Sequence, residues 1–315
     1  AGSYCGIIAE QGRVTLGIQK RADLIQEQGD ALAAAKQGRV VWKKELLQEV
    51  ACLVECPKPV LGRYDEKFLD IPREVLLTCM ESHQKCFGLE DANGRLLPYF
   101  LTTLNLEPED LELVRTGWER VLRARLEDAA FFWKVDSGAT LEQWREELNK
   151  VVFLGPLGSM GDKANRLGDL AGLIAGQLAP ELKDDLCRAA QLAKTDLVSE
   201  MVGEFATLQG IMGSIYADQK SEAKAVSQAI LEHYRPVGHD SPVPDSLIGS
   251  LLAVTDKLDN LIGCFGLNMI PSGTQDPYAL RRQALGIIRI VFEQGLRFSL
   301  PAYIDKAQSI YGDTD

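Results

Sequence analysis

The spacing of apolar residues predicts helices over most of the first half of the chain. Ile18, Ala22 and Ile25 recur at the period of an amphipathic helix, and other segments repeat this pattern. A further helix begins at Pro72, and Thr140 is placed to cap another. The predicted helices cover residues 18–36, 46–54, 72–80, 106–133 and 141–152.

Three short segments of the first half have the composition of strands instead. Residues 39–42 predict a short strand, and residues 85–89 and 96–103 predict a hairpin around the turn Asp91-Ala92-Asn93-Gly94. Pro57, Pro59 and Gly62 predict a loop between two helices. The first part of the chain is therefore expected to be α+β.

The second half has helical periodicity almost throughout. Gly155-Pro156-Leu157-Gly158-Ser159 is the strongest interior signal for a linker, which places a domain boundary near residue 150. The pattern predicts helices over residues 160–178, 181–203, 221–234, 246–265 and 277–294, with a long loop at 236–244. The predicted fold is mostly α, with an α+β domain over residues 1–150 and an all-α domain over 151–315.

Composition and charge narrow the class of protein. The 315 residues are 46% hydrophobic and 25% charged, which is ordinary for a folded protein of two domains. No segment approaches the roughly 18 uninterrupted apolar residues of a membrane span, and the first residues lack a signal-peptide pattern, so a cytoplasmic protein without membrane contact is expected. The net charge of −11 argues against a protein that coats nucleic acid, and DNA is not an expected partner.

Cysteines and histidines offer little chemistry. Seven cysteines are scattered, and the spacings Cys52-x3-Cys56 and Cys79-x6-Cys86 are not paired zinc knuckles, so reduced thiols are favoured over a zinc site. The three histidines are too far apart in the sequence for a catalytic cluster, and His233 is expected at the surface or at a helix end. The sequence lacks the motifs of a nucleophile elbow, a P-loop and a dinucleotide fold.

Several arginines are candidates for contact with a polyanion. Asp276 and Pro277 are typical of a helix start, which places Arg281 and Arg282 in a first turn where the helix dipole disfavours cations. Arg289 lies seven residues beyond Arg282 and shares its face. Phosphate contact is one interpretation of these residues, and pairing with carboxylates is the other.

A second group of arginines lies on the helix predicted over residues 106–133. Arg120 and Arg123 are neighbours at i and i+3, and Glu119 and Glu127 are within reach of Arg123. A solvated face with ion pairs is the favoured interpretation of this group, and contact with the backbone of a polyanion is the alternative.

An ordered set of three sequence strings carries a family resemblance. Residues 118–132 read WERVLRARLEDAAFF, residues 196–213 read DLVSEMVGEFATLQGIMG, and residues 276–282 read DPYALRR. From about residue 13 to about residue 300, the chain resembles the beta subunit of bacterial glycyl-tRNA synthetase. The resemblance implies a fragment that lacks the family's editing-like and anticodon-binding domains.

The resemblance also implies a function. The chain is expected to be a non-catalytic part of an aminoacyl-tRNA synthetase that binds tRNA(Gly) and the alpha subunit and supports ATP-dependent glycylation of tRNA. In this family the activating site lies on the alpha subunit, so ATP and Mg²⁺ are expected there and no cofactor is expected in this chain. The residues proposed for tRNA contact are Arg120, Arg123, Arg281, Arg282 and Arg289.

The helical half further resembles an HD domain, a fold that often holds a metal for phosphate hydrolysis. That fold uses an early histidine, then a histidine–aspartate pair, then a later aspartate. Here Thr195 stands in place of the paired histidine, next to Asp196, and Asp256 matches the last aspartate. The early position, near Lys163, has no histidine. Without these two imidazoles a transition metal loses essential ligands. Asp196 and Asp256 are therefore predicted to pair with Lys194, Lys257 or another cation, or to cap backbone amides.

Two alternative functions remain open at this point. One is a metal-dependent HD-type phosphohydrolase that acts on nucleotides, against which the missing histidine at Thr195 argues. The other is a purely structural module that contacts only the alpha subunit.

Overall fold

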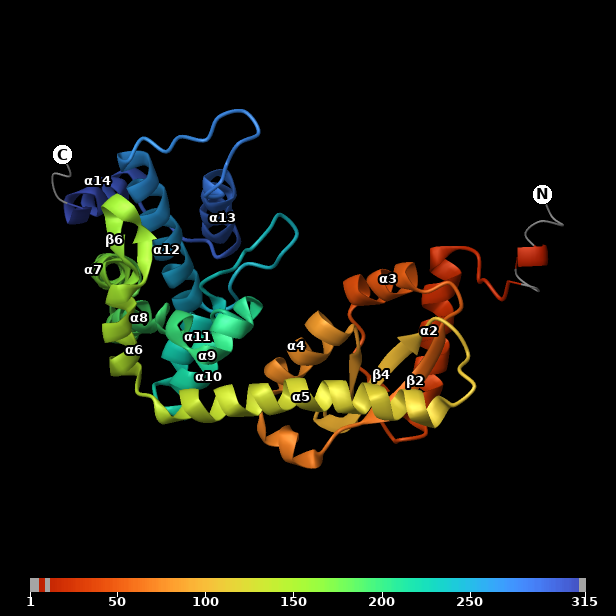
Figure 1. Cartoon of the computed structure of the whole chain (residues 1–315). Coiled ribbons are helices and arrows are strands. Elements are labelled where there is room, and N and C mark those ends of the chain that lie inside the picture. Colours follow the sequence, from red (N-terminus) through yellow and green to blue (C-terminus); the bar gives the residue numbers. More distant parts are fainter. Residues whose placement is uncertain (1–5, 9–11, 312–315) are drawn as a thin grey trace. The chain divides into compact units, whose positions relative to one another are not determined.

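The structure is a computed structural model in which residues 6–8 and 12–311 are described. The chain divides into two compact units, Ala1–Lys134 and Val135–Asp315 (Figure 1). This division falls before the boundary that the sequence predicted near residue 150. Mostly helical architecture with an α+β first part agrees with the predicted fold class.

The first unit is built on a four-stranded antiparallel sheet with strand order β1-β3-β4-β2. The strands are β1 (Arg39–Val40), β2 (Lys58–Arg63), β3 (Phe87–Glu90) and β4 (Leu96–Leu104). The helices of this unit are α2 (Ile18–Ala34), α3 (Lys44–Leu53), α4 (Arg73–Gln84) and the first part of α5 (Leu111–Gly138). Ile25, Val50 and Leu89 are buried where α2, α3 and the sheet pack together.

The hairpin of β3 and β4 confirms the turn that the sequence predicted. Asp91 Oδ1 accepts hydrogen bonds from the amides of Asn93 at 2.8 Å and Arg95 at 2.9 Å. Gly94 has a φ of 79°, which an L-residue adopts only with strain.

Strand β2 corrects the loop predicted around Pro59 and Gly62. It pairs with β4 along six residues, from Lys58 opposite Leu104 to Arg63 opposite Tyr99. Because β2 is an edge strand, Pro59 costs the sheet no interior hydrogen bond. Gly62 is needed for packing, since a Cβ there would lie 2.2 Å from the ring of Phe100.

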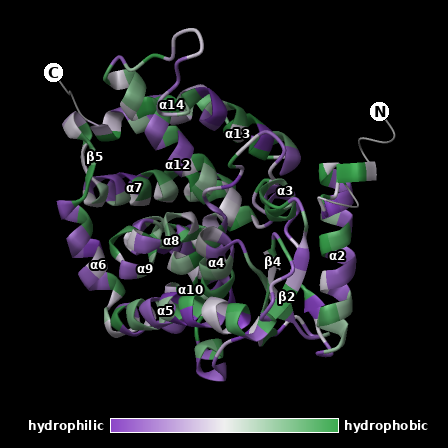
Figure 2. Ribbon diagram, turned by 45° about the vertical axis from the view of Figure 1, so that its right-hand side comes forward, coloured by the Kyte–Doolittle hydropathy of each residue, from purple (hydrophilic) through white to green (hydrophobic). Residues whose placement is uncertain are grey.

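The second unit is helical, and the sequence predicted most of its helices closely. They are α6 (Leu141–Glu147), α7 (Met160–Leu178), α8 (Lys183–Leu192), α9 (Glu200–Glu204), α10 (Ile211–Gln219), α11 (Lys224–Glu232), α12 (Leu247–Gly266), α13 (Leu280–Glu293) and α14 (Leu300–Tyr311). Helices α10 and α14 were not predicted, and the single helix predicted over residues 181–203 is divided into α8 and α9 by a 3-10 turn at Thr195–Val198. Figure 2 shows hydrophobic and hydrophilic residues alternating along α2 and α7, as expected for helices with one buried face.

The segment predicted as a linker is instead an ordered hairpin inside the second unit. Helix α6 ends at Glu147, a short 3-10 turn follows, and β5 (Val152–Leu154) pairs with β6 (Gly158–Ser159). Leu157 in its turn is buried. Glycine and proline here serve a tight turn, and they do not separate two domains.

Helix α12 forms the centre of this unit. It contacts α7, α8, α11, α13 and α14, and its residues are buried almost continuously from Ile248 to Asp259. Across residues 6–8 and 12–311, no helix is both long and apolar enough to cross a membrane.

Candidate functional site

The second unit contains a buried cluster of charged residues around α12. Lys163 lies in the first turn of α7, whose start is fixed by a capping box between Ser159 and Asp162. Its Nζ lies 2.9 Å from Asp256 Oδ1 and 2.8 Å from Asp259 Oδ2, and it also donates to Asn260 Oδ1 at 2.8 Å. The Lys163 side chain is only 2% exposed, so its charge depends on these partners.

A second lysine reaches the same carboxylate from the end of α8. Lys194 Nζ lies 2.9 Å from Asp256 Oδ2 and 2.9 Å from His233 Nε2, and 3.9 Å from the centre of the Tyr234 ring. Burial would raise the pKa of Asp256, but Lys163 and Lys194 hold that pKa well below its usual range. The predicted pairing of Asp256 with Lys194 is thus confirmed.

His233 is buried in this cluster and is the C-cap residue of α11, so it lies at a helix end, one of the two predicted places, and not at the surface. Its Nδ1 lies 2.6 Å from the carbonyl oxygen of Ile230, so the ring donates there and Nε2 accepts from Lys194. Burial and the charge of Lys194 lower the pKa of His233 well below its usual value. The imidazole is therefore neutral.

Asp196 and Thr195, at the expected histidine–aspartate pair, face other groups. Asp196 Oδ2 accepts from the amides of Gly210 at 2.6 Å and Gly213 at 3.0 Å, which confirms the prediction of amide capping. Burial raises the pKa of Asp196 to about 6. Thr195 Oγ1 donates to the carbonyl oxygen of Leu192 at 2.8 Å, so it is not directed at Asp256.

These contacts do not fit a divalent cation. A metal bound at Asp256 needs free carboxylate oxygens and further oxygen or nitrogen ligands. Here the ammonium groups of Lys163 and Lys194 each lie 2.9 Å from one Asp256 oxygen. Asp196 already accepts a hydrogen bond from the amide of Gly213 in α10. Within the described residues, no group of three or more histidine, cysteine or acidic side chains is arranged to hold a metal.

Lys257 follows Asp256 but does not pair with a carboxylate, so of the two predicted lysine partners only Lys194 is used. Its Nζ donates to the carbonyl oxygens of Arg235 at 2.9 Å and His233 at 3.3 Å. Burial lowers the pKa of Lys257 to about 8, although the nearby Asp256 acts in the opposite direction. A third buried ammonium group is thus present beside the first two.

A pocket of about 590 Å³ opens above the cluster. Its lining includes four basic residues and one acidic residue, namely Lys163, Lys194, Lys257, Arg282 and Asp256. The start of α13 and the loop after α11 form much of its rim, through Ala279, Gln283 and Pro236. In a protein with a net charge of −11, this is a locally positive concave surface.

The structure separates the three candidate arginines of α13. Asp276 accepts hydrogen bonds from the amides of Leu280 and Arg281, so it caps the helix, although the helix starts later than predicted. Arg281 then donates to the carbonyl oxygens of Gly273 and Pro271. The next residue, Arg282, is exposed on the pocket side and forms no hydrogen bond or ion pair with any described residue.

Arg289 is largely occupied by its own surroundings. Its Nη1 donates to the carbonyl oxygens of His239 at 2.8 Å and Ser241 at 3.0 Å, and its guanidinium pairs with Glu293 at 3.1 Å. These contacts fasten α13 to the loop after α11. Arg289 therefore offers fewer free donors than Arg282.

Arg120 and Arg123 lie exposed on the part of α5 that belongs to the first unit. The predicted pair of Glu119 with Arg123 is not formed. Glu119 instead accepts from the amide of Arg63 at 2.9 Å and lies 3.8 Å from Arg115. Neither Arg120 nor Arg123 has a polar partner in the part of the chain that the structure describes.

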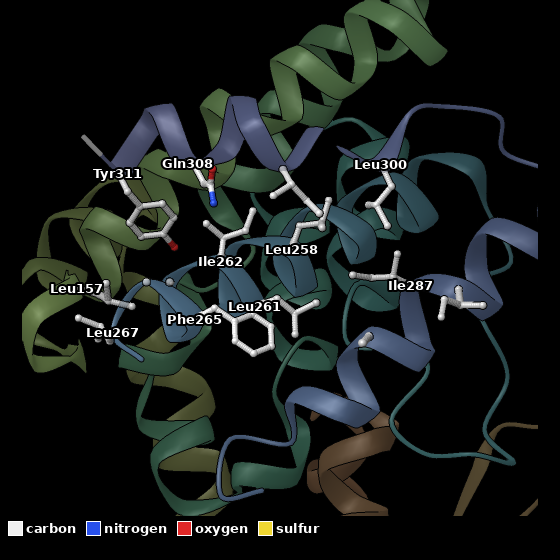
Figure 3. Close-up of a pocket in the computed structure, with 15 residues that line it drawn as sticks. Leu157, Leu258, Leu261, Ile262, Phe265, Leu267, Ile287, Leu300, Gln308 and Tyr311 are labelled. Carbon is white, nitrogen blue, oxygen red and sulfur yellow. The ribbon is translucent and has the colours of Figure 1, made fainter. Parts of the chain in front are cut away.

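A second pocket of the helical unit, of about 430 Å³, is apolar (Figure 3). Side chains of α12, α13 and α14, including Ile262, Ile287 and Leu300, point into it, and its lining has no charged residue. Tyr311 at its edge donates to Asp259 Oδ1 at 2.6 Å. This pocket therefore does not suit an anion, but its wall supports the carboxylate that holds Lys163.

The sequence pointed to Asp196, Asp256 and Lys194, but not to Lys163 as the central cation. One feature of the sequence could have identified Lys163. Lys163 lies in register with Leu167, Leu170 and Ile174, which form the buried stripe of α7. A lysine in such a stripe needs a buried partner, and the acidic residues of α12 are the partners in reach.

Comparison with known proteins agrees with the resemblance seen in the sequence. The family model described as "Glycyl-tRNA synthetase beta subunit" matches residues 1–315. The chain is 56% identical over 313 residues to the glycine–tRNA ligase beta subunit of Nitratidesulfovibrio vulgaris strain Hildenborough, and 54% identical over 313 residues to that of Oleidesulfovibrio alaskensis. Each alignment covers 99% of this chain and 45% of the relative.

A more distant relative gives the same result. The glycine–tRNA ligase beta subunit of Ectopseudomonas mendocina is 45% identical over 292 residues, which is 93% of this chain and 42% of that protein. The chain thus spans about half the length of the curated relatives it matches. With a family model that covers its whole length, the chain belongs to the glycyl-tRNA synthetase beta subunit family.

Proposed function

We propose that this chain is a non-catalytic portion of a glycine–tRNA ligase that binds tRNA(Gly) and the alpha subunit and so supports glycylation of tRNA. The observation that carries this proposal is the Lys163–Asp256–Lys194 cluster, because two ammonium groups lie where an HD-type hydrolase would need a cation. Family membership supplies the reaction. ATP and Mg²⁺ belong on the alpha subunit in this proposal, and the complex works in the cytoplasm.

Exposed arginines without partners support contact with tRNA. Arg282 in the helical unit and Arg120 and Arg123 in the first unit have guanidinium groups that no described residue engages. Arginine binds phosphate through two parallel hydrogen bonds, and A-form RNA presents rows of phosphates to such side chains. Binding would then depend on a few local charges and not on the net charge of the chain.

Exposed apolar side chains support a protein partner. On α13, Leu285 is 58% exposed, Ile288 48% and Phe292 80%. Large apolar side chains grouped on a helix face are typical of an interaction surface. The alpha subunit is the partner that the family implies.

Titration of the chain with labelled tRNA(Gly) at several salt concentrations tests the tRNA part of the proposal. We expect a dissociation constant that rises steeply with salt, because phosphate contacts release counterions. Absence of salt-dependent binding at low ionic strength would contradict this part. Size-exclusion chromatography with purified alpha subunit, in the presence and absence of tRNA, tests the second part.

The rival hydrolase function has its own test. Metal analysis of the purified chain, together with a phosphate-release assay on nucleotides, distinguishes the two functions. Stoichiometric, tightly held metal together with phosphate release would overturn the non-catalytic assignment.

A further inference from the structure

The positive pocket of the helical unit has features that contact with an RNA surface does not require. Lys163, Lys194 and Lys257 lie beneath it, and each is no more than 5% exposed. Charges in such a recessed, poorly hydrated place act more strongly on a ligand than charges on an open surface. Arginines on the exterior would suffice for a phosphate backbone alone.

The hydrogen bonds of the buried lysines are already largely used. Lys163 has oxygens of Asp256, Asp259 and Asn260 around its ammonium group, and Lys194 has Asp256 and His233. Against the carboxylates of Asp256 and Asp259, the three buried lysines leave one positive charge in excess, and they offer only limited direct contact. A ligand must find its hydrogen-bond donors elsewhere on the lining.

Two side chains of the lining meet that need. Arg282 and Tyr234 both line the pocket, and neither side chain has a hydrogen-bond partner in the part of the structure that is described. Burial and the charges of Asp196 and Asp256 keep the pKa of Tyr234 well above its usual value, so the hydroxyl remains a donor. Guanidinium and phenol hydroxyl groups are both good donors to phosphate oxygens.

We propose that this pocket binds the terminal phosphate of a nucleotide, with Arg282 and Tyr234 as the direct donors and the buried lysines as the source of positive potential. A phosphate monoester fits better than a backbone diester. It carries about two negative charges near neutral pH and presents three oxygens. It also has one substituent, so its phosphate group can approach Arg282 and Tyr234 from more directions than a backbone diester can.

The volume of the pocket, about 590 Å³, falls in the range of sites for small ligands. The phosphate can come from a free nucleoside monophosphate or from the 5′ end of an RNA strand, because both present the same group. The inference does not rest on tRNA binding by the chain. It also needs no metal and no chemical step.

Isothermal titration of the 315-residue chain with AMP tests the proposal. We expect one binding site per chain and competition by inorganic phosphate. Arg282→Ala and Tyr234→Phe should each weaken AMP binding about tenfold, since each removes a donor. The phenylalanine keeps the ring over Lys194 and loses only the hydroxyl, so it tests the contact without disturbing the cluster.

A charge-matched control accompanies these variants. Arg297 is exposed, does not line the pocket and has no polar partner among the described residues, so Arg297→Ala should bind AMP as the unaltered chain does. Equal binding of AMP by all three variants, or no binding at millimolar AMP, would overturn the proposal. So would an equal loss of binding in Arg297→Ala.

A second arm identifies the source of the phosphate. A short RNA with a 5′-phosphate is compared with the same RNA lacking it, each as a competitor of AMP. Competition that requires the 5′-phosphate supports an RNA end as the ligand, and a lack of competition by either RNA supports a free nucleotide. Equal competition by both RNAs would contradict recognition of a terminal phosphate.

Discussion

Lys163 of α7 and Asp256 of α12 form a buried ion pair in which Nζ and Oδ1 are 2.9 Å apart. Both side chains are less than 10% exposed, so water solvates either one poorly if the other is removed. The pair also ties the start of α7 to the central helix of the unit. Loss of this ion pair should therefore destabilise the whole helical unit.

Replacement of either partner tests this relationship. We expect Lys163→Met and Asp256→Asn each to lower the free energy of unfolding by about 3–5 kcal/mol, because each leaves a buried charge with fewer partners. The double variant should lose at least about 1 kcal/mol less than the sum of the two. Urea denaturation followed by circular dichroism measures these changes.

An exposed ion pair provides the control for this comparison of single and double variants. Lys224 pairs with Asp218, and its side chain is 84% exposed. Lys224→Met should change stability by less than about 1 kcal/mol, because water solvates the remaining carboxylate. Strict additivity of the Lys163 and Asp256 variants would show that the buried pair is not energetically coupled.

The raised pKa of Asp196 predicts a specific pH dependence of stability. Its pKa is about 6 in the folded chain and 3.8 in the reference state, so the folded state binds the proton more tightly. Protonation of Asp196 therefore contributes to the free energy of unfolding. This contribution is fully present below pH 3.8 and is lost as the pH rises through about 6. Above that pH the folded chain contains a buried carboxylate, one of whose oxygens has no hydrogen-bond partner among the described residues.

Asp196→Asn removes this titration. We expect the variant to gain stability relative to the unaltered chain as the pH rises from 4 to 7, by about 1–3 kcal/mol in total. Urea denaturation at several pH values measures the difference. The exposed Asp169→Asn serves as a control and should give no such trend; a pH-independent difference for Asp196→Asn would contradict the prediction.

The contact of Gly62 with Phe100 predicts intolerance of a side chain on β2. A Cβ at Gly62 would lie 2.2 Å from the Phe100 ring, which is fully buried and cannot move away freely. Gly62→Ala should therefore destabilise the first unit by about 1–3 kcal/mol, as overpacked core positions do. Gly117→Ala on α5 is the matched control, because open space surrounds that glycine and alanine favours the helix by up to about 1 kcal/mol. Thermal denaturation of both variants provides the comparison, and equal melting temperatures would refute the packing argument.

The same strand explains where sequence reasoning about the fold failed. Apolar periodicity correctly predicted helices such as α2 and α7, since it reports directly which face is buried. Strand β2 was missed because Pro59 and Gly62 are typical of loops, and their tolerance depends on the edge position and on the Phe100 ring. Both reasons depend on tertiary contacts, which leave no pattern in the local sequence.

The candidate site was predictable to a similar extent. The resemblance to an HD domain singled out Asp196 and Asp256, and the residue types nearby gave Lys194 as a partner. Lys163 joins them only because α7 packs against α12, which one sequence does not specify. Likewise, the sequence gives no reason to separate Arg281 from Arg282, because only the folded loop around Gly273 determines which of them is engaged.

That difference between adjacent arginines gives the sharpest test of tRNA contact. Arg282→Ala removes a guanidinium without a polar partner in the described structure, so tRNA(Gly) affinity should fall about three- to tenfold. The slope of log K against log salt concentration should decrease by roughly one, as expected for one lost phosphate contact. Arg281→Ala removes the same charge, but its side chain binds the carbonyl oxygens of Gly273 and Pro271. We therefore expect Arg281→Ala to lower the melting temperature and to leave the salt slope nearly unchanged. Anisotropy titrations with both variants distinguish a specific contact of Arg282 from a general effect of charge. Equal losses of affinity and slope in the two variants would mean that general charge, and not the side chain of Arg282, governs binding.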